Sequence, residues 1–190
     1  MILETERTVL RPWRETDAEA LYEYAKDERV GPVAGWQPHK NVEESLEIIR
    51  SIFMQDGVFA VTLKGEEKAI GCIGVLTGKK SNFDIGEDEG ELSYWIGVPF
   101  WGKGLITEAA IKIIDYAFED LKLKKLWCGY FDGNEKSRRV QEKCGFHHHH
   151  TCEKTYFPMT DDYRIEHVSL LTRDEWEKRK RCANFVIANL

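Results

Sequence analysis

The stretch VPFWGKGLITEA, residues 98–109, puts two glycines and a lysine between an expected strand (91–98) and an expected long helix. Glycines let backbone N–H groups approach a ligand without a Cβ in the way, and the start of a helix favours anions. The stretch is therefore either a structural turn or a phosphate-binding loop, and two glycines alone do not decide between them. The helix is expected because apolar residues recur at helical spacing: Ile106, Ala110, Ile113, Ala117 and Leu121.

The glycine spacing differs from both of the common phosphate loops. A P-loop requires GxxxxGK followed by Ser or Thr, and the dinucleotide loop requires GxGxxG. If the present stretch binds phosphate, backbone N–H groups at the start of the helix would converge on a diphosphate, and one lysine would add charge. The residues expected to contribute are Gly102, Lys103, Gly104, Leu105, Ile106 and Thr107.

The rest of the 190-residue chain alternates short strands with helices in a mixed order. This order predicts a single α+β domain over 1–190 with a mixed central sheet, rather than a doubly wound parallel sheet. Two capping boxes are expected, Thr16 with Glu19 and Thr172 with Glu175. About seven strands are expected, at 8–13, 58–63, 69–76, 91–98, 125–130, 146–157 and 162–171. Helices are expected at 16–25, 42–55, 106–121, 134–144 and about 172–188, with a loop at 31–39.

Composition excludes several classes of protein. A net charge of −6 argues against a basic surface that binds nucleic acid. No apolar run approaches the roughly 18 residues of a membrane span, and the start of the chain lacks a basic region followed by an apolar core. Five cysteines without a CxxC pair fit a reducing compartment, with thiols acting as small apolar residues. We therefore expect a cytoplasmic protein, monomeric or homodimeric, without nucleic acid or membrane partners.

A second segment, NEKSRRVQEKCGF at 134–146, lies about 30 residues beyond the glycine turn. Its Asn134 and Ser137 stand where the short helix begins. Asn and Ser are common helix-start residues, so capping is the structural explanation. Gly145 is expected to end the helix.

Taken together, VPFWGKGLITEA and NEKSRRVQEKCGF resemble the acetyl-CoA-binding core of the GNAT N-acetyltransferases. The similarity is closest to the RimJ/RimL-like branch, which contains the ribosomal-protein N-terminal acetyltransferases, and extends over about residues 4–172. It implies the GNAT fold, acetyl-CoA as co-substrate and an amine as acceptor. The family usually has Gln or Arg where this chain has Pro99. Because backbone amides supply most of the phosphate contacts, the loop is expected to keep its role.

The resemblance also implies how the thioester is held. Two adjacent parallel strands, 91–98 and 125–130, would splay, and the pantetheine arm would pair between them like an added strand. Gly97 would accommodate the bulge that opens them. The backbone N–H groups of Ile96, Gly97 and Val98 would polarise the thioester carbonyl. Asn134 would position the cofactor arm, and Ser137 would protonate the departing CoA thiolate.

The amine must be neutral to attack the thioester. A protein α-amine has a pKa of ~7.7–8, so roughly a tenth of it is neutral at pH 7, whereas a lysine has a pKa of ~10.4. An α-amine therefore needs only a modest base. Glu91 is the first candidate because GNAT enzymes often place a base on this strand; the structural alternative is a solvated strand end. Glu153 is the reserve candidate, Tyr156 lies in the same stretch, and water acting alone is the remaining possibility.

The acceptor is less constrained than the donor. Trp36 and His39 lie in the loop where the family shapes its acceptor pocket, and Trp95 is expected to form another wall, with core packing as the alternative. The preferred acceptor is the α-amine of a protein or peptide. A polyamine, amino acid or antibiotic amine is the alternative. A non-catalytic acyl-CoA-binding module is a hypothesis of a different class.

Four consecutive histidines, His147 to His150, suggest a metal site at first sight. On a strand, side chains alternate, so His147 and His149 would share one face while His148 and His150 share the other. At most two would reach one ion, and the sequence supplies no third ligand at a clear spacing. No metal is therefore expected.

Overall fold

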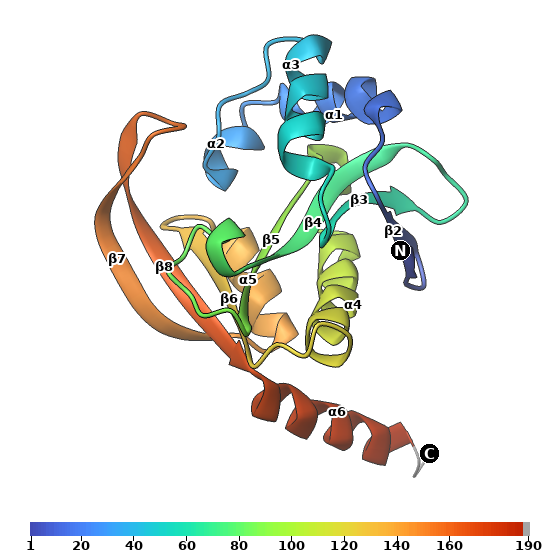
Figure 1. The fold of residues 1–190 in the computed structure, drawn as a ribbon, viewed down its shortest axis with the longest axis vertical. Helices are drawn as coiled ribbons and strands as arrows, with labels where there is room; N and C mark the ends of the chain where they lie inside the picture. The colour runs from blue at the N-terminus through green and yellow to red at the C-terminus, as the bar shows by residue number, and fades with distance from the viewer. Residues whose placement is uncertain (188–190) are drawn as a thin grey trace.

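The computed structural model describes residues 1–187, with side chains up to Cys182, and builds them around one eight-stranded sheet (Figure 1). The strand order is β1-β2-β3-β4-β5-β6-β8-β7, and the pairing is antiparallel except between β5 and β6. The short β1 is one strand more than the seven expected. The strands are β1 Leu3–Glu4, β2 Thr8–Arg11, β3 Val58–Leu63, β4 Ala69–Thr77, β5 Glu89–Ile96, β6 Lys125–Phe131, β7 His147–Phe157 and β8 Asp162–Thr172.

The helices match the expected ones with one addition, the short α2, which replaces part of the loop expected at 31–39. Pro32 suits the first turn of a helix because its missing N–H is not needed there, and Gly35 ends α2 in the left-handed conformation. The final residue expected in the last helix, 188, lies outside the described residues. The helices are α1 Ala18–Ala25, α2 Gly31–Ala34, α3 Val42–Ile48 (continued by a π-helical turn, Ile49–Phe53), α4 Leu105–Glu119, α5 Glu135–Cys144 and α6 Arg173–Ile187.

The two expected capping boxes have different outcomes. The box before α6 is confirmed, since Thr172 donates from its N–H and its hydroxyl to the Glu175 carboxylate, at 2.9 and 2.6 Å. The box of Thr16 and Glu19 is wrong. The carboxylate of Asp17 instead accepts the N–H of Arg14 at 2.9 Å, because a 3₁₀ turn precedes α1.

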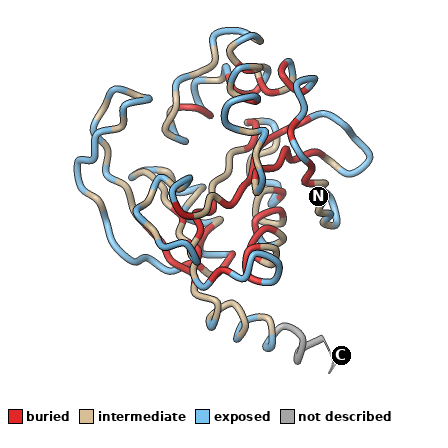
Figure 2. The backbone as a smooth tube through the Cα atoms, in the orientation of Figure 1, coloured by how far each residue is buried: buried red, intermediate tan, exposed pale blue. Residues whose placement is uncertain are grey.

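Helices cover both faces of the sheet. The apolar residues of α4, such as Ala109, Ala110 and Ile113, pack with Leu92 of β5 and Leu126 of β6 in the larger core. A second core lies beneath α1 and α3. Figure 2 shows the buried residues concentrated in the central strands and α4, whereas the hairpin of β7 and β8 is mostly exposed along its outer part. Within residues 1–187, no helix is both long and apolar enough to cross a membrane.

The parallel strands β5 and β6 separate soon after they meet. They pair at only three positions, from Glu89 opposite Lys125 to Glu91 opposite Trp127, and then β5 follows β4 while β6 follows β8. The expected pair of splayed parallel strands is confirmed. The expected bulge at Gly97 is wrong, because the β4–β5 register runs without a shift to Ile96 and β5 ends there.

Candidate active site

The glycine turn forms an open loop at the N-terminus of α4. Gly102 and Gly104 both have positive φ, +73° and +76°, which favours glycine, and Gly104 is the N-cap residue. The first N–H groups of a helix have no partner within the helix, and here they belong to Leu105, Ile106 and Thr107. A Cβ at Gly102 would have no atom within 4 Å, so the loop surface there is open. This backbone is suited to an anionic ligand.

Basic side chains from distant segments flank the same loop. Arg7 donates through Nη1 to the carbonyl oxygen of Lys103 at 3.0 Å, while its Nε is held by Glu108 at 2.7 Å. From α5, Lys136 places its Nζ 3.6 Å from the ring centroid of Trp101. The sequence pattern pointed only to Lys103; Arg7 and Lys136 were missed because the fold, not local spacing, brings them to the loop.

The backbone beside the strand gap is only partly available to a thioester. Gly97 donates its N–H to the carbonyl oxygen of Ile70 at 2.9 Å, so that N–H is occupied. N–H groups alternate in direction along an antiparallel strand, so the N–H of Ile96 points away from β4, toward the gap. The carbonyl of Ile96 accepts from Trp101 Nε1 at 2.7 Å. Of the three N–H groups predicted to contact the thioester carbonyl, those of Ile96 and Val98 therefore remain as candidates.

Asn134 and Ser137 begin α5. The Oδ1 of Asn134 accepts the N–H of Ser137 at 3.2 Å, which is the capping arrangement, and its Nδ2 donates to the carbonyl of Val33 in α2 at 3.2 Å. Asn134 therefore ties α5 to the short helix that borders the acceptor side. This contact does not test a role toward acetyl-CoA, which stays a prediction.

The hydroxyl of Ser137 belongs to a small hydrogen-bonded group. Its Oγ lies 3.0 Å from the Tyr94 hydroxyl and accepts from Gln141 Nε2 at 3.3 Å. The Tyr94 hydroxyl also reaches the Ser137 carbonyl at 3.2 Å, and burial raises the pKa of Tyr94 well above its usual value. Tyr94 has a single hydroxyl hydrogen. When Tyr94 donates it to Ser137 Oγ, the Ser137 hydrogen is free for another acceptor; when Tyr94 donates it to the carbonyl, the Ser137 hydroxyl donates to Tyr94. Tyr94 and Gln141 were not recognised in the sequence, because neither belongs to the N-x-x-S pattern.

The three residues expected in the acceptor pocket lie together. The ring of Trp36 is 5.2 Å from that of His39 and 6.0 Å from that of Trp95, measured between centroids. Burial lowers the pKa of His39, so its ring is neutral at neutral pH. Phe131 extends this wall, since its ring faces Gly35 and lies 4.7 Å from that of Phe157. The result is an aromatic wall built from the loop after α2 and from β5, β6 and β7.

Glu91 lies on the same face of β5 as Trp95 and is only 7% exposed. Its carboxylate accepts hydrogen bonds from Ser81 Oγ at 2.8 Å, from the Asn82 N–H at 2.6 Å and from Asn82 Nδ2 at 2.9 Å. The alternative of a solvated strand end is therefore wrong. Glu153 is exposed on β7. No observed contact shows whether Glu91 or Glu153 acts as a base, so both assignments stay predictions.

Glu166, on β8, was missed by the sequence reasoning. Burial, and then the nearby charge of Glu91, raise the pKa of Glu166 to about 7. Its carboxylate packs over Gly129 of β6, where a Cβ would collide with Glu166 Oε1. In the sequence it is one charged residue of an alternating strand, and nothing local connects it with Glu91, 75 positions earlier.

Removing the ionisable group at Glu166 is expected to stabilise the protein at high pH only. The folded-state pKa is raised from 4.5, so the favourable contribution is complete only below pH 4.5 and is lost as pH rises from there through about 7. A shift of this size corresponds to at most about 3 kcal/mol, and solvent exposure reduces it to on the order of 1–2 kcal/mol. Glu166→Gln should therefore exceed the wild type in free energy of unfolding at pH 8 and match it at pH 4, below the unfolded-state pKa, measured by urea denaturation. An equal difference at both pH values would contradict this account.

The four histidines lie exposed on β7, and their expected alternation is wrong. A register shift between His148 and His150 places the rings of His149 and His150 beside Trp127, with centroids 4.9 and 6.5 Å away. Over the part of the chain that the structure describes, no group of three or more His, Cys, Asp or Glu side chains could hold a metal ion.

Three cysteines are buried with strongly raised pKa values. Burial raises the pKa of Cys72 and of Cys144 to about 12 and that of Cys128 well above its usual value. These thiols stay protonated, which agrees with the expectation that they act as small apolar residues.

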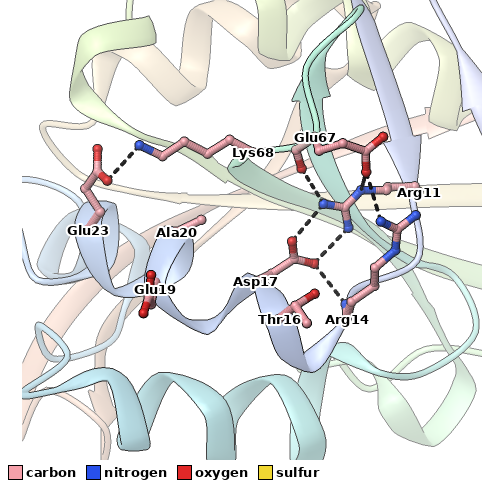
Figure 3. A pocket seen from close by; sticks show the side chains of 9 residues that line it. All are labelled: Arg11, Arg14, Thr16, Asp17, Glu19, Ala20, Glu23, Glu67 and Lys68. Atoms are coloured by element: carbon pink, nitrogen blue, oxygen red, sulfur yellow. Dashed lines mark hydrogen bonds and ion pairs between the residues drawn. The ribbon is translucent and has the colours of Figure 1, made fainter.

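A cavity of about 390 Å³ lies beside β2 and α1, away from the residues above (Figure 3). Its centre is an ion pair in which the Arg11 guanidinium donates two hydrogen bonds to the Asp17 carboxylate, at 2.8 and 2.7 Å. Arg14 and Lys68 at its rim are each paired with a glutamate, Glu67 and Glu23. The cavity contains none of the candidate site residues, and its charged side chains form ion pairs with one another.

Comparison with known proteins gives a consistent family. The Acetyltransferase (GNAT) domain family matches residues 7–147. YdaF of Bacillus subtilis (strain 168), whose name describes it provisionally as a ribosomal N-acetyltransferase, is 38% identical over 120 residues, which are 62% of this chain and 65% of YdaF. The N-acetyltransferase p20 of Bacillus licheniformis, which its name calls uncharacterized, is 30% identical over 129 residues, 65% of this chain and 70% of p20.

Solved structures agree on the fold. A GNAT-family acetyltransferase from Bacillus anthracis superposes with a TM-score of 0.80 at 24% identity, covering 92% of this chain and all of that one. At this identity the likeness concerns the fold alone. The match of the domain family to most of the chain carries the assignment: the chain belongs to the GNAT N-acetyltransferases.

Proposed function

We propose that this protein transfers the acetyl group of acetyl-CoA to a primary amine by direct attack on the thioester, without a covalent acyl-enzyme. GNAT acetyltransferases use acetyl-CoA and an amine acceptor. The supporting observation in this chain is the gap between β5 and β6, with an open glycine loop and the α5 start on one side and an aromatic wall on the other.

The residues that hold acetyl-CoA would be those of the loop. The N–H groups from Gly102 to Thr107 would bind the diphosphate, with charge from Lys103, Arg7 and Lys136. Ile96 and Val98 would polarise the thioester carbonyl, and Asn134 would position the pantetheine arm. The proposed fit of this loop to the diphosphate of acetyl-CoA rests on the positive φ of Gly102 and Gly104, which exposes the loop amides. Bound acetyl-CoA supplies the activated acyl group.

The proposed acceptor is the α-amine of a protein or peptide. The name of YdaF, which describes a ribosomal N-acetyltransferase, supports a protein substrate. The chemistry supports it as well, because an α-amine of pKa ~7.7–8 needs a weaker base than a lysine of pKa ~10.4. Amines of small molecules are the alternative acceptors, and the experiment below separates them.

Two measurements on the whole chain test this function. Calorimetry with acetyl-CoA should give saturable binding, and no binding would contradict the proposal. A thiol-release assay should then compare peptides with a free N-terminus against the same peptides with a blocked N-terminus and a free lysine, and against polyamines and amino acids. We expect release with free N-termini. Tight binding without release on any amine would favour a non-catalytic acyl-CoA-binding module instead.

Ser137→Ala is expected to lower kcat by roughly 10- to 100-fold while changing the KM for acetyl-CoA little, because only the leaving thiolate needs the hydroxyl hydrogen. Ser51→Ala is the matched control, since Ser51 is exposed and donates only to the Glu47 carbonyl. The measurement is steady-state thiol release with the best amine. A normal kcat in the Ser137 variant would remove this residue from the proposed mechanism.

A further inference from the structure

The carboxyl group of Glu166 lies beside the gap between β5 and β6. Trp127 is the last β6 residue paired with β5, and Gly129, two positions further, lies on the same face of the strand. The Glu166 carboxylate covers Gly129 at a point where a Cβ would meet Glu166 Oε1 and would lie 3.1 Å from the ring of Phe83. The absence of a side chain at Gly129 therefore gives this carboxylate its place next to the opened strands.

Glu89, Glu91 and Glu166 lie near the gap on this face of the sheet, and their partners differ. Glu89 is held by Lys125 at 2.8 Å and by Trp127 Nε1 at 2.6 Å. Glu91 is held by Ser81 and Asn82, as described above. Among the described residues, none donates a hydrogen bond to the Glu166 carboxylate. Glu166 therefore keeps its acceptor positions free for a ligand proton, whereas those of Glu89 and Glu91 are occupied.

We propose that Glu166 is the group that accepts the proton of the attacking amine, and that Glu91 is a positioning residue beside it. The inference rests on the proposed acetyl transfer and replaces Glu91 and Glu153 as the base. Glu91 anchors the segment of Ser81 and Asn82, and the next residue, Phe83, forms one wall of the space occupied by the Glu166 carboxylate. The aromatic wall of Trp36, Trp95 and Phe131 would border the substrate that carries the amine.

The reaction balances with the residues named. The neutral amine nitrogen forms a bond to the thioester carbonyl carbon, and its proton passes to the Glu166 carboxylate. The carbon–sulfur bond then breaks, and the thiolate takes the hydrogen of the Ser137 hydroxyl. Ser137 regains a proton from water, and Glu166 returns its proton to water. The net products are the amide and CoA, with no change in oxidation state.

The electrostatic surroundings suit this role. Because of burial and the charge of Glu91, the pKa of Glu166 is about 7, close to that of an effective general base at neutral pH. The other ionisable groups nearby are Cys128 on β6, Cys152 opposite Glu166 on β7, and Arg164 and His167 on β8. Arg164 is bound to Asp162 at 2.8 Å, and His167 lies 3.2 Å from Asp132.

The test compares Glu166→Gln, Glu166→Asp and the wild type in kcat/KM for one amine between pH 5.5 and 9. All proteins meet the same amine, so its own ionisation contributes equally. We expect Glu166→Gln to lose at least about 100-fold in kcat and to lack the acidic limb with its midpoint near 7, while its Kd for acetyl-CoA stays within about twofold. Glu166→Asp should keep the limb and part of the rate. A space-filling role would give the reverse order, because Gln preserves the size of Glu and Asp does not.

Glu66→Gln is the matched control, because Glu66 is an exposed carboxylate in the turn between β3 and β4, outside the candidate site. It should keep the wild-type rate and pH profile. A wild-type profile in Glu166→Gln, or a limb that disappears in Glu91→Gln but persists in Glu166→Gln, would overturn the assignment of Glu166. Failure of the wild type itself to bind acetyl-CoA or to release thiol would instead contradict the proposed function, so the two failures are distinguishable.

Discussion

Replacing Asp17 by Ala is expected to reduce the free energy of unfolding by about 3–5 kcal/mol, because it leaves a buried guanidinium without its counter-ion. Arg11 is 4% exposed and Asp17 is 5% exposed. Two hydrogen bonds join their side chains, and Arg11 also donates to the carbonyl of Glu67 (Figure 3). A further bond from Arg11 goes to the carbonyl of Pro12. Arg11 has no other buried acid to pair with in the described contacts.

The control for this prediction is Glu67→Ala. Glu67 also reaches Arg11 and Arg14, but its side chain is 82% exposed, so its removal should cost only about 0–1 kcal/mol. Urea denaturation of the three proteins at pH 7 measures both effects, and an unchanged m-value would show that the comparison is valid. A loss below about 1 kcal/mol for the Asp17 variant would show that the guanidinium finds water or another partner.

The ion pair of Arg11 and Asp17 is connected to the candidate active site through α1. Asp17 fixes the start of this helix by accepting the Arg14 N–H. Tyr24, one residue before the end of the helix, packs on Gly97. A Cβ at Gly97 would lie 2.6 Å from Tyr24 Cδ1, so the glycine is needed for this close approach. Gly97 therefore connects α1 to the strand end that precedes the phosphate loop, rather than opening a bulge.

Features set by local sequence were predictable. The helical spacing that begins at Ile106 predicted α4, and Thr172 with Glu175 predicted the start of α6. Two glycines at the helix start indicated the open loop, and the resemblance placed the splayed pair of strands around it. In each case a few neighbouring residues, or one family pattern, fix the geometry.

Features set by strand register were not predictable. Glu166 reaches Gly129 only because β8 pairs with β6 in one particular register, with Phe131 opposite Glu166. Periodicity assigns residues to faces of a strand but does not say which strands are neighbours. The β7 bulge shows a second limit, because one extra residue at His148–His150 reversed the alternation expected for the histidines.

Replacing Gly104 by Val is expected to weaken binding of CoA by roughly 10- to 100-fold, which corresponds to the loss of one or two charge-assisted hydrogen bonds from the loop amides. Two causes act together. A β-branched residue strongly disfavours the φ of +76° at this position, so the backbone would rotate and turn the N–H groups away. A Cβ would also point toward Arg7, whose Nη2 would lie 3.5 Å from it.

The effect of Gly104→Val on stability, through backbone strain, must be separated from its effect on CoA binding. Gly65→Val offers the comparison. Gly65 has a φ of +84°, no atom within 4 Å of a Cβ, and a place in the turn between β3 and β4, away from the loop. Gly65→Val should therefore lose a similar part of the free energy of unfolding, roughly 1–3 kcal/mol, and bind CoA with the wild-type Kd. Calorimetry and urea denaturation on both variants distinguish the effects. Wild-type affinity in the Gly104 variant would refute the phosphate-loop assignment, since Val strongly disfavours that backbone and should disturb the amides on which the site depends.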